Sequence, residues 1–114
     1  MGKIVNAKIT STQFGIEDHG IMTFYISVEM QDTVCCVGGY ALDQFDHETG
    51  TRISFGRSMM AMRMILETVG VRNWEDLPGK FIRVEHNGLG SSITRIGNII
   101  EEKWVDLKEF FSRG

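Results

Sequence analysis

The chain has 114 residues, of which 42% are hydrophobic and 24% charged, the usual balance of one globular domain. Its formal net charge of −3 and pI near 5.6 argue against nonspecific binding to duplex nucleic acid, which depends on neutralising phosphates. No apolar run approaches the ~20 residues that span a bilayer, and the start lacks a signal-peptide core, so we expect a single α+β domain over residues 1–114 in the cytoplasm.

Charge distribution and cysteine content add two constraints. Residues 1–50 carry a formal charge of −5, whereas residues 51–114 carry +2. The basic remainder leaves room for a local site that holds a small phosphorylated ligand. Cys35 and Cys36 are the two cysteines, and neighbours on a strand point to opposite faces, so we expect two reduced thiols that do not pair with each other.

The first third of the chain predicts three strands. Apolar and polar residues alternate over 3–11 and, most regularly, over 21–30, a period of two that is typical of half-buried strands. Residues 17–20, Glu-Asp-His-Gly, predict the turn between them. Residues 33–41 are rich in β-forming side chains and follow after a short connection, so the second and third strands should form a hairpin.

The middle of the chain changes from loop to helix. Residues 42–54 are polar and predict a loop. After it, apolar residues recur at helical spacing, and the expected buried stripe is Phe55, Met59, Met62, Leu66 and Val69. Gly70 is placed to end this helix, and Asn73 to cap one further turn before the Pro78-Gly79 turn.

The last third predicts a second hairpin and a tail helix. Residues 80–86 and 92–99 flank a glycine-rich turn, and Trp104, Leu107 and Phe111 recur at helical spacing. The expected fold class is therefore α+β, an antiparallel sheet of about five strands with one main helix and a short C-terminal helix packed on it. Two Trp, seven Phe and seven Met exceed what so small a domain can bury, which favours a homodimer or a higher homo-oligomer.

No group of residues with catalytic or metal-binding spacing stands out. Asp43, Asp46 and His47 match no zinc-ligand pattern, and no nucleophile elbow surrounds Ser58. The G-x-G of residues 88–90 lies between two strands, which favours a plain hairpin turn over a dinucleotide-binding loop. We therefore expect no catalytic residue, no metal and no cofactor.

Glycine and arginine residues indicate a ligand site. Gly38 and Gly39 let the backbone bend or approach a neighbour closely, and Arg57 lies at the start of the main helix, where backbone N–H groups are free. Arg83 and Arg95 lie on the two strands of the second hairpin. A guanidinium fork suits phosphate, but each arginine is also compatible with an ordinary surface charge paired with a nearby glutamate, and the residues alone leave both interpretations open.

Five segments carry a family resemblance. They are HGIMTF (19–24), GGYALD (38–43), VGV (69–71), WEDLPGK (74–80) and RIGNII (95–100). Over roughly residues 3–106 the chain resembles the first Thoeris anti-defence family of small phage and prophage proteins. The resemblance implies a protein without enzymatic activity that sequesters cyclic ADP-ribose isomers, such as glycocyclic ADP-ribose, made by bacterial TIR-domain proteins. Some members are also thought to bind cyclic oligonucleotides.

The resemblance further implies an antiparallel sheet that helices join into a dimer, with ligand pockets at the subunit interface, in the cytoplasm of an infected host. Such a ligand carries a pyrophosphate, riboses and an adenine, so a protein that holds it uncleaved needs fixed donors and an aromatic wall. We expect Arg57, with one further arginine, on the phosphates, an aromatic ring on the base and an amide on a base edge or ribose. The candidate ligand-binding residues are Tyr40, Arg57, Arg83, Arg95, Asn98 and Trp104.

Two other functions stay open at this point. The acidic N-terminal half is compatible with a protein-binding inhibitor of a bacterial defence nuclease, similar to an anti-CRISPR protein. Tyr25, Tyr40 and Trp104 are compatible with a phage accessory protein for single-stranded DNA, although the acidic pI argues against it. We expect neither a membrane nor duplex nucleic acid as a partner.

Overall fold

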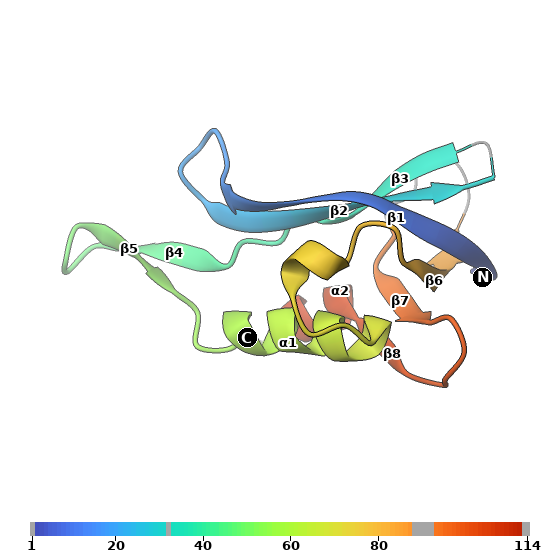
Figure 1. Cartoon of the computed structure of the whole chain (residues 1–114). Helices are drawn as coiled ribbons and strands as arrows, with labels where there is room; N and C mark the ends of the chain where they lie inside the picture. The colour runs from blue at the N-terminus through green and yellow to red at the C-terminus, as the bar shows by residue number, and fades with distance from the viewer. Residues whose placement is uncertain (1, 32, 88–92, 113–114) are drawn as a thin grey trace.

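The structure, a computed structural model, describes residues 2–31, 33–87 and 93–112 (Figure 1). In these ranges the elements are β1 (Lys3–Ile16), β2 (Met22–Met30), β3 (Thr33–Gly38), β4 (Asp43–Asp46), β5 (Thr51–Ser54), α1 (Ser58–Val69), the 3-10 turn η1 (Trp74–Asp76), β6 (Phe81–His86), β7 (Arg95–Asn98), β8 (Trp104–Asp106) and α2 (Leu107–Ser112). Six strands form one sheet in the order β3-β2-β1-β6-β7-β8, and β4 pairs with β5 alone. The α+β class expected from the sequence is confirmed.

The long strand β1 organises the sheet because it changes partner along its length. It pairs with β6 over residues 3–8 and with β2 from Lys8 to Ile16, and the register shifts between Ile9 and Ser11. The order β6-β1-β2-β3 is that of a Greek key. A parallel bridge joins Val37 on β3 to Ile93, just before β7, so the sheet curls round into a partly open barrel.

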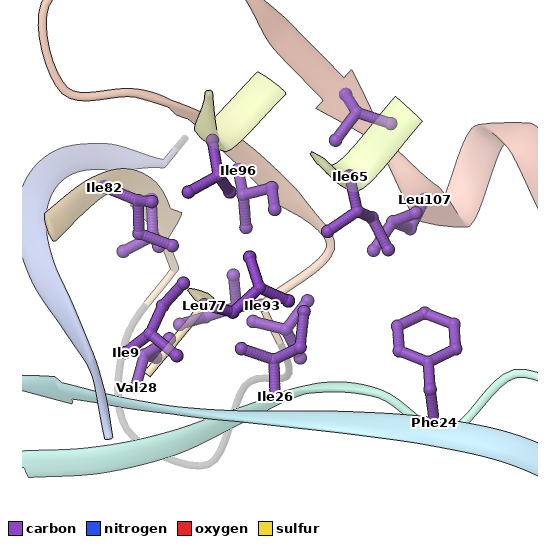
Figure 2. Packing of buried hydrophobic residues seen from close by; sticks show 14 of the residues in the cluster. Ile9, Phe24, Ile26, Val28, Ile65, Leu77, Ile82, Ile93, Ile96 and Leu107 are labelled. Carbon is purple, nitrogen blue, oxygen red and sulfur yellow. The ribbon is translucent and has the colours of Figure 1, made fainter. Parts of the chain in front are cut away.

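The hydrophobic core fills this barrel. Side chains of Phe24, Ile26 and Val28 point from β2 toward Ile65 of α1 and Ile96 of β7 (Figure 2). All five are fully buried, and each contributes roughly 1.5–3 kcal/mol relative to exposure. The strict alternation that predicted this strand is confirmed. Among the described residues, the structure contains no helix with the length and apolar character needed to cross a membrane.

The buried face of α1 differs from the expected stripe. Its buried residues are Ser58, Ala61, Met62, Ile65, Thr68 and Val69, and Met59, predicted to be buried, is 66% exposed. Ser58 Oγ donates to the Leu42 carbonyl at 2.6 Å, so Ser58 lies on the buried face. Met59 follows it by one residue and therefore lies off that face of the helix. Gly70 ends the helix with φ 93°, as predicted.

Three element predictions were wrong. Residues 42–54 form the β4–β5 hairpin, which extends away from the rest of the molecule (Figure 1), and not a loop. Trp104 lies on β8, so the tail helix begins only at Leu107. The first strand continues to Ile16, beyond the predicted end at residue 11. The irregularity after Ile9 inverts the alternation of inward and outward side chains, so that Phe14 lies on the inner side and contacts Trp74.

Candidate functional site

Arg83, Arg95 and Trp104, here called the arginine–tryptophan cluster, come together on three neighbouring strands. Arg83 on β6 lies opposite Gly97 on β7, and Gly97 lies opposite Trp104 on β8. A Cβ atom on Gly97 would lie 2.6 Å from Trp104 Cδ2, so the indole rests where a side chain is missing. The guanidinium carbons of Arg83 and Arg95 lie 4.9 and 4.4 Å from the indole ring centroid. This spacing is that of cation–π contacts.

Each arginine of the cluster is balanced by a carboxylate. Arg83 donates to Glu102 Oε1 at 2.9 Å, and the Trp104 indole N–H donates to Glu102 Oε2 at 3.2 Å. The Arg83 hydrogen bond, followed by that from Trp104, lowers the pKa of Glu102 below its ordinary value. Arg95 donates to Glu85 Oε1 at 3.0 Å. The cluster therefore carries two cations whose charge is offset, and the Glu102 side chain that offsets one of them is 77% exposed.

The two arginines differ in how many donors remain free. Arg83 also donates from Nε to the Asn98 carbonyl and from its second amino group to the Glu101 carbonyl, so three of its five N–H groups are used. Arg95 uses one N–H group on Glu85 within the described residues. Arg83 thus fixes the geometry of the cluster, and Arg95 is better able to bind an added phosphate.

Asn98 is held behind the cluster by four hydrogen bonds. Its Nδ2 donates to the carbonyls of Thr68 and Val69 at the end of α1, and its Oδ1 accepts from the N–H groups of Ile100 and Glu101. These bonds use the full capacity of the amide, and the residue is 8% exposed. The side chain joins the last turn of α1 to the β7–β8 connection and leaves no free group for a ligand.

Arg57 lies far from the cluster. It is the N-cap of α1, and Asn98 contacts the opposite end of this 12-residue helix, which spans about 18 Å. Its guanidinium lies 5.9 Å from the Phe55 ring, and its buried Nε has no hydrogen-bond partner among the residues that the structure describes. The structure therefore separates Arg57 from the two arginines with which it was expected to act.

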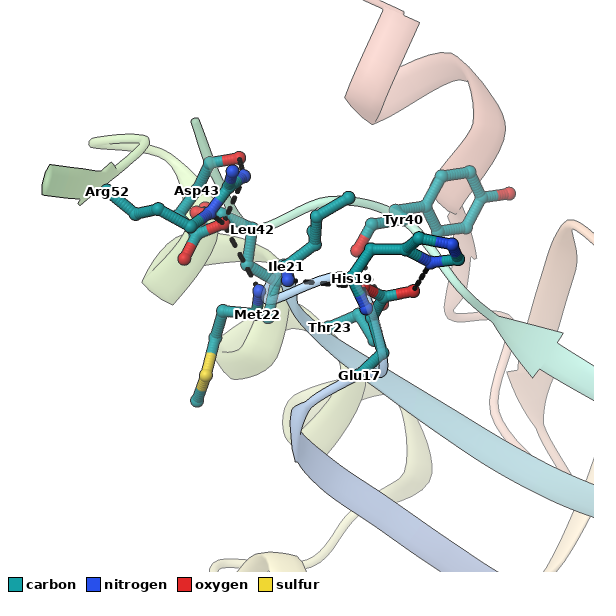
Figure 3. Close-up of polar contacts among 10 residues, drawn as sticks. Glu17, His19, Ile21, Met22, Thr23, Tyr40, Leu42, Asp43 and Arg52 are labelled. Atoms are coloured by element: carbon teal, nitrogen blue, oxygen red, sulfur yellow. Dashed lines mark hydrogen bonds and ion pairs between the residues drawn. The ribbon is translucent and has the colours of Figure 1, made fainter. Parts of the chain in front are cut away.

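Tyr40 is not part of the arginine–tryptophan cluster, and its ring already stacks on another aromatic ring. The ring of Phe111 from α2 lies nearly parallel to the Tyr40 ring with a centroid distance of 4.8 Å. The backbone carbonyl of Tyr40 accepts a hydrogen bond from Thr23 Oγ1. Burial, and secondly the nearby charge of Asp106, raise the pKa of Tyr40 above its ordinary value. Figure 3 shows Tyr40 close to Thr23.

Gly38 and Gly39 allow the chain to turn where it lies close to β2 of the same molecule. Gly38 and Gly39 have φ angles of 118° and 87°, and a Cβ on Gly38 would overlap the Phe24 carbonyl oxygen. The chain then enters the hairpin at Asp43, whose carboxylate accepts from Met22 N–H and from Arg52 (Figure 3). The Arg52 bond is the main reason why the pKa of Asp43 lies below its ordinary value.

Two residues that complete the cluster were missed from the sequence. Gly97 supplies the space under the indole, and Glu102 bridges Arg83 to Trp104. The sequence shows that Arg95 and Gly97 alternate along one predicted strand. Their pairing with Trp104 depends on β8, a segment for which the sequence predicts a helix. Residues 88–90, which carry the G-x-G sequence, lie outside the described residues.

Comparison with protein-family models, with curated proteins and with solved structures finds no match to this chain. Within the described ranges, no three His, Cys, Asp or Glu side chains gather closely enough to hold a metal ion. Cys35 and Cys36 are both free thiols, as expected.

Proposed function

We propose that this chain is a non-catalytic phage anti-defence protein that sequesters a cyclic ADP-ribose-type nucleotide in the host cytoplasm. One observation supports a nucleotide ligand above all, namely the two guanidinium groups within 5 Å of one indole ring. Guanidinium forks bind phosphate, and their planes and the indole edge can pack against a base. The resemblance to the first Thoeris anti-defence family specifies the cyclic ADP-ribose class.

The two carboxylates that pair with the arginines of the cluster should weaken the binding of a phosphate. An incoming phosphate competes with Glu85 for Arg95 and with Glu102 for Arg83. Neutralising either carboxylate should free donors without disturbing the strands. Binding should therefore weaken when an arginine is removed and strengthen when its glutamate becomes glutamine, a pattern that a purely structural ion pair would not produce.

We expect Arg95→Ala to weaken binding of cyclic ADP-ribose isomers by about ten- to a hundredfold, the value of a lost charged hydrogen bond. Glu102→Gln should strengthen it. Calorimetric titration measures both, with Arg63→Ala as a matched control, because Arg63 is an exposed arginine paired with Glu67 on α1. Ligand recovered after heat denaturation should be chemically intact. Equal affinity of wild type and Arg95→Ala would remove the cluster from the site, and hydrolysed ligand would refute sequestration.

A second candidate, binding of single-stranded nucleic acid, is favoured by the strand order. Five of the six strands, β3-β2-β1-β6-β7, with the Val37–Ile93 bridge joining the two ends, form a partly open Greek-key barrel. A five-stranded barrel of this kind is the arrangement of the OB fold, which commonly binds oligonucleotides. This is an analogy of fold and does not identify a site. The same titrations with an oligothymidylate separate the candidates, because oligonucleotide binding should fall steeply with salt and be indifferent to cyclic ADP-ribose.

We also propose that the protein forms a homodimer through the start of α1 and the β4–β5 hairpin. Met59 and Met60 are 66% and 52% exposed, and Phe45 and Ile53 on the hairpin are 48% and 44% exposed. An isolated two-stranded hairpin is at best marginally stable in water, so a second copy packing on it would stabilise it.

Light scattering of the purified chain should give the mass of a dimer. The double variant Met59→Gln/Met60→Gln should shift it toward the monomer. Ile100→Gln is the control, because Ile100 is 85% exposed but follows β7, away from the start of α1. A monomeric wild type at micromolar concentration would contradict this assembly.

A further inference from the structure

The second half of β1 has a strand on one side only. On its other side β6 accompanies β1 over residues 3–8, and the chain that enters β6 bonds once more at Ile9, whose N–H donates to the Lys80 carbonyl. Over residues 11–16, here called the free edge, β2 is the only strand partner among the described residues. Figure 1 shows β6 beside the N-terminal end of β1, whereas the other end reaches the β1–β2 turn without it.

The backbone groups of alternate residues on the free edge point away from β2. Phe14 lies opposite Phe24 of β2, and the Phe24 carbonyl accepts from Gly39 N–H on the other side of that strand. Residues directly opposite each other in an antiparallel pair either bond to each other or both turn their backbone groups outward. The N–H and C=O groups of Phe14 therefore point outward, and by alternation so do those of Thr12 and Ile16. None of these groups has a hydrogen-bond partner among the described residues.

The free edge lacks the charges and prolines that usually keep a strand edge from pairing. Residues 10–16, TSTQFGI, contain no charged residue and no proline. Phe14 and Ile16 are 37% and 72% exposed. Unpaired N–H and C=O groups on such an edge are a template for another strand. The free edge therefore has the properties of a surface that accepts an added β-strand.

The two ends of the free edge carry opposite charges. Lys8 and Lys80 lie at its start, and Glu17 and Asp18 follow its end. Lys80 and Asp18 form no ion pair within the part of the chain that the structure describes. When two copies of one strand pair antiparallel, the acidic end of each lies beside the basic end of the other. This charge complementarity favours a second copy of the chain as the added strand.

We propose that two copies of the chain join through their free edges into one continuous antiparallel sheet with two-fold symmetry. The register that uses every outward group places Phe14 opposite Phe14 of the second copy, and Thr12 opposite Ile16. Each copy then donates three N–H groups to the other and accepts three in return. The two Phe14 side chains lie opposite each other, which is a favourable aromatic cross-strand pair. Both copies use the same surface, as a two-fold interface requires.

The edge contact is separate from the surface proposed above for the homodimer. It uses no residue of α1 or of the β4–β5 hairpin, and the arginine–tryptophan cluster lies on other strands. So short an edge buries less area than the ~1,200 Å² of a stable interface, so we expect a Kd on the order of 100 µM. At micromolar concentration the chain should therefore keep the mass set by the α1 surface, and the edge contact should form at higher concentration.

Amide–water exchange of the full-length chain, measured by NMR, tests the contact residue by residue. Between about 30 µM and 1 mM, exchange at Thr12, Phe14 and Ile16 should slow about threefold, because the unpaired fraction falls by that factor at a Kd of about 100 µM. Gln13 and Gly15 are internal controls, since their amides bond to β2 and should not respond to concentration.

Sedimentation velocity over the same range measures the assembly. The mass should at least double, from the dimer to a tetramer. If the α1 surface does not form a dimer, the doubling should instead run from monomer to dimer, so a failure of that surface and a failure of the edge contact give different results.

Paired charges test the register. The like-charge variant, Thr12→Lys/Ile16→Lys, places two cations opposite each other at both ends of the pairing and should weaken association about five- to tenfold. The opposite-charge variant, Thr12→Lys/Ile16→Glu, should associate at least as tightly as wild type. Val34→Lys/Cys36→Lys is the control, because it adds the charge of the like-charge variant at two exposed positions of β3, and it should associate as wild type.

Three results would overturn the proposal. One is an unchanged mass with unchanged exchange up to about 1 mM, ten times the expected Kd. Another is slow exchange of the Phe14 amide that persists in the like-charge variant at low concentration, because the chain would then cover its own edge. The third is equal association of the like-charge and opposite-charge variants, which would exclude the register. Nucleotide binding by the arginine–tryptophan cluster does not depend on any of these outcomes.

Discussion

Replacing Asn98 by alanine should destabilise the protein by about 2–4 kcal/mol, because each buried group left without a partner costs roughly 1–3 kcal/mol. The substitution removes all four bonds of the amide and leaves the Thr68 and Val69 carbonyls without their side-chain donor. Chemical denaturation followed by tryptophan fluorescence measures the loss. A change below about 1 kcal/mol, together with weaker nucleotide binding, would return Asn98 to the ligand site that the sequence predicted.

The matched variant Asn98→Asp keeps the shape and the two accepted bonds but loses the donors. A carboxylate there faces two carbonyls at the negative end of α1, so its pKa in the folded state should rise above the ordinary value near 3.9. A raised folded pKa means that the charged form is destabilising above that pKa and that the penalty is relieved as pH falls through it. The stability deficit of Asn98→Asp should therefore shrink toward acid pH, whereas that of Asn98→Ala should not.

Replacing Gly38 by alanine should destabilise the protein by about 3–4 kcal/mol, the sum of backbone strain and overpacking. Its φ of 118° disfavours any residue with a Cβ, and that Cβ would overlap the Phe24 carbonyl oxygen, part of the rigid β2 backbone. For a domain of this size the melting temperature should fall by about 4 °C per kcal/mol.

Gly50→Ala separates the two contributions. Gly50 also has a positive φ, 71°, but no atom lies within 4 Å of the position that its Cβ would take. Its substitution should cost only the strain, about 1 kcal/mol. If both variants lose the same stability, Gly38 is required for its backbone angle alone, and the close approach to Phe24 is relieved by a small shift.

The fold could be predicted where the pattern is local. The alternation of Phe24, Ile26 and Val28 and the helix-ending Gly70 both follow from spacing along the chain, and both are confirmed. The length of β1 could not be predicted, because the register shift after Ile9 inverts the alternation and makes the strand look as if it had ended. The β4–β5 hairpin was missed because its pairing depends on Asp43 and Arg52, two polar residues typical of a loop.

The candidate site was predictable only in part. Arg83 and Arg95 were placed correctly on neighbouring strands, but their contact with Trp104 needs β8, whose three residues are too short to show a period. Arg57 and Tyr40 have suitable chemistry and lie elsewhere, since chemistry along a sequence does not specify distance in space.

The projecting β4–β5 hairpin and the rest of the molecule should differ in how readily their backbone hydrogen bonds open. Outside its own ladder, β4–β5 is anchored near its base by the Met22–Asp43 hydrogen bond and the Phe55–Leu42 hydrogen bond, and its large apolar residues Phe45 and Ile53 stay 48% and 44% exposed. The strands around β1 open only when the core opens. In a monomer, amide protons of β4 and β5 should therefore exchange with solvent through local opening, orders of magnitude faster than those of β2. Slow exchange in the hairpin would be a direct signature of a second molecule holding it closed.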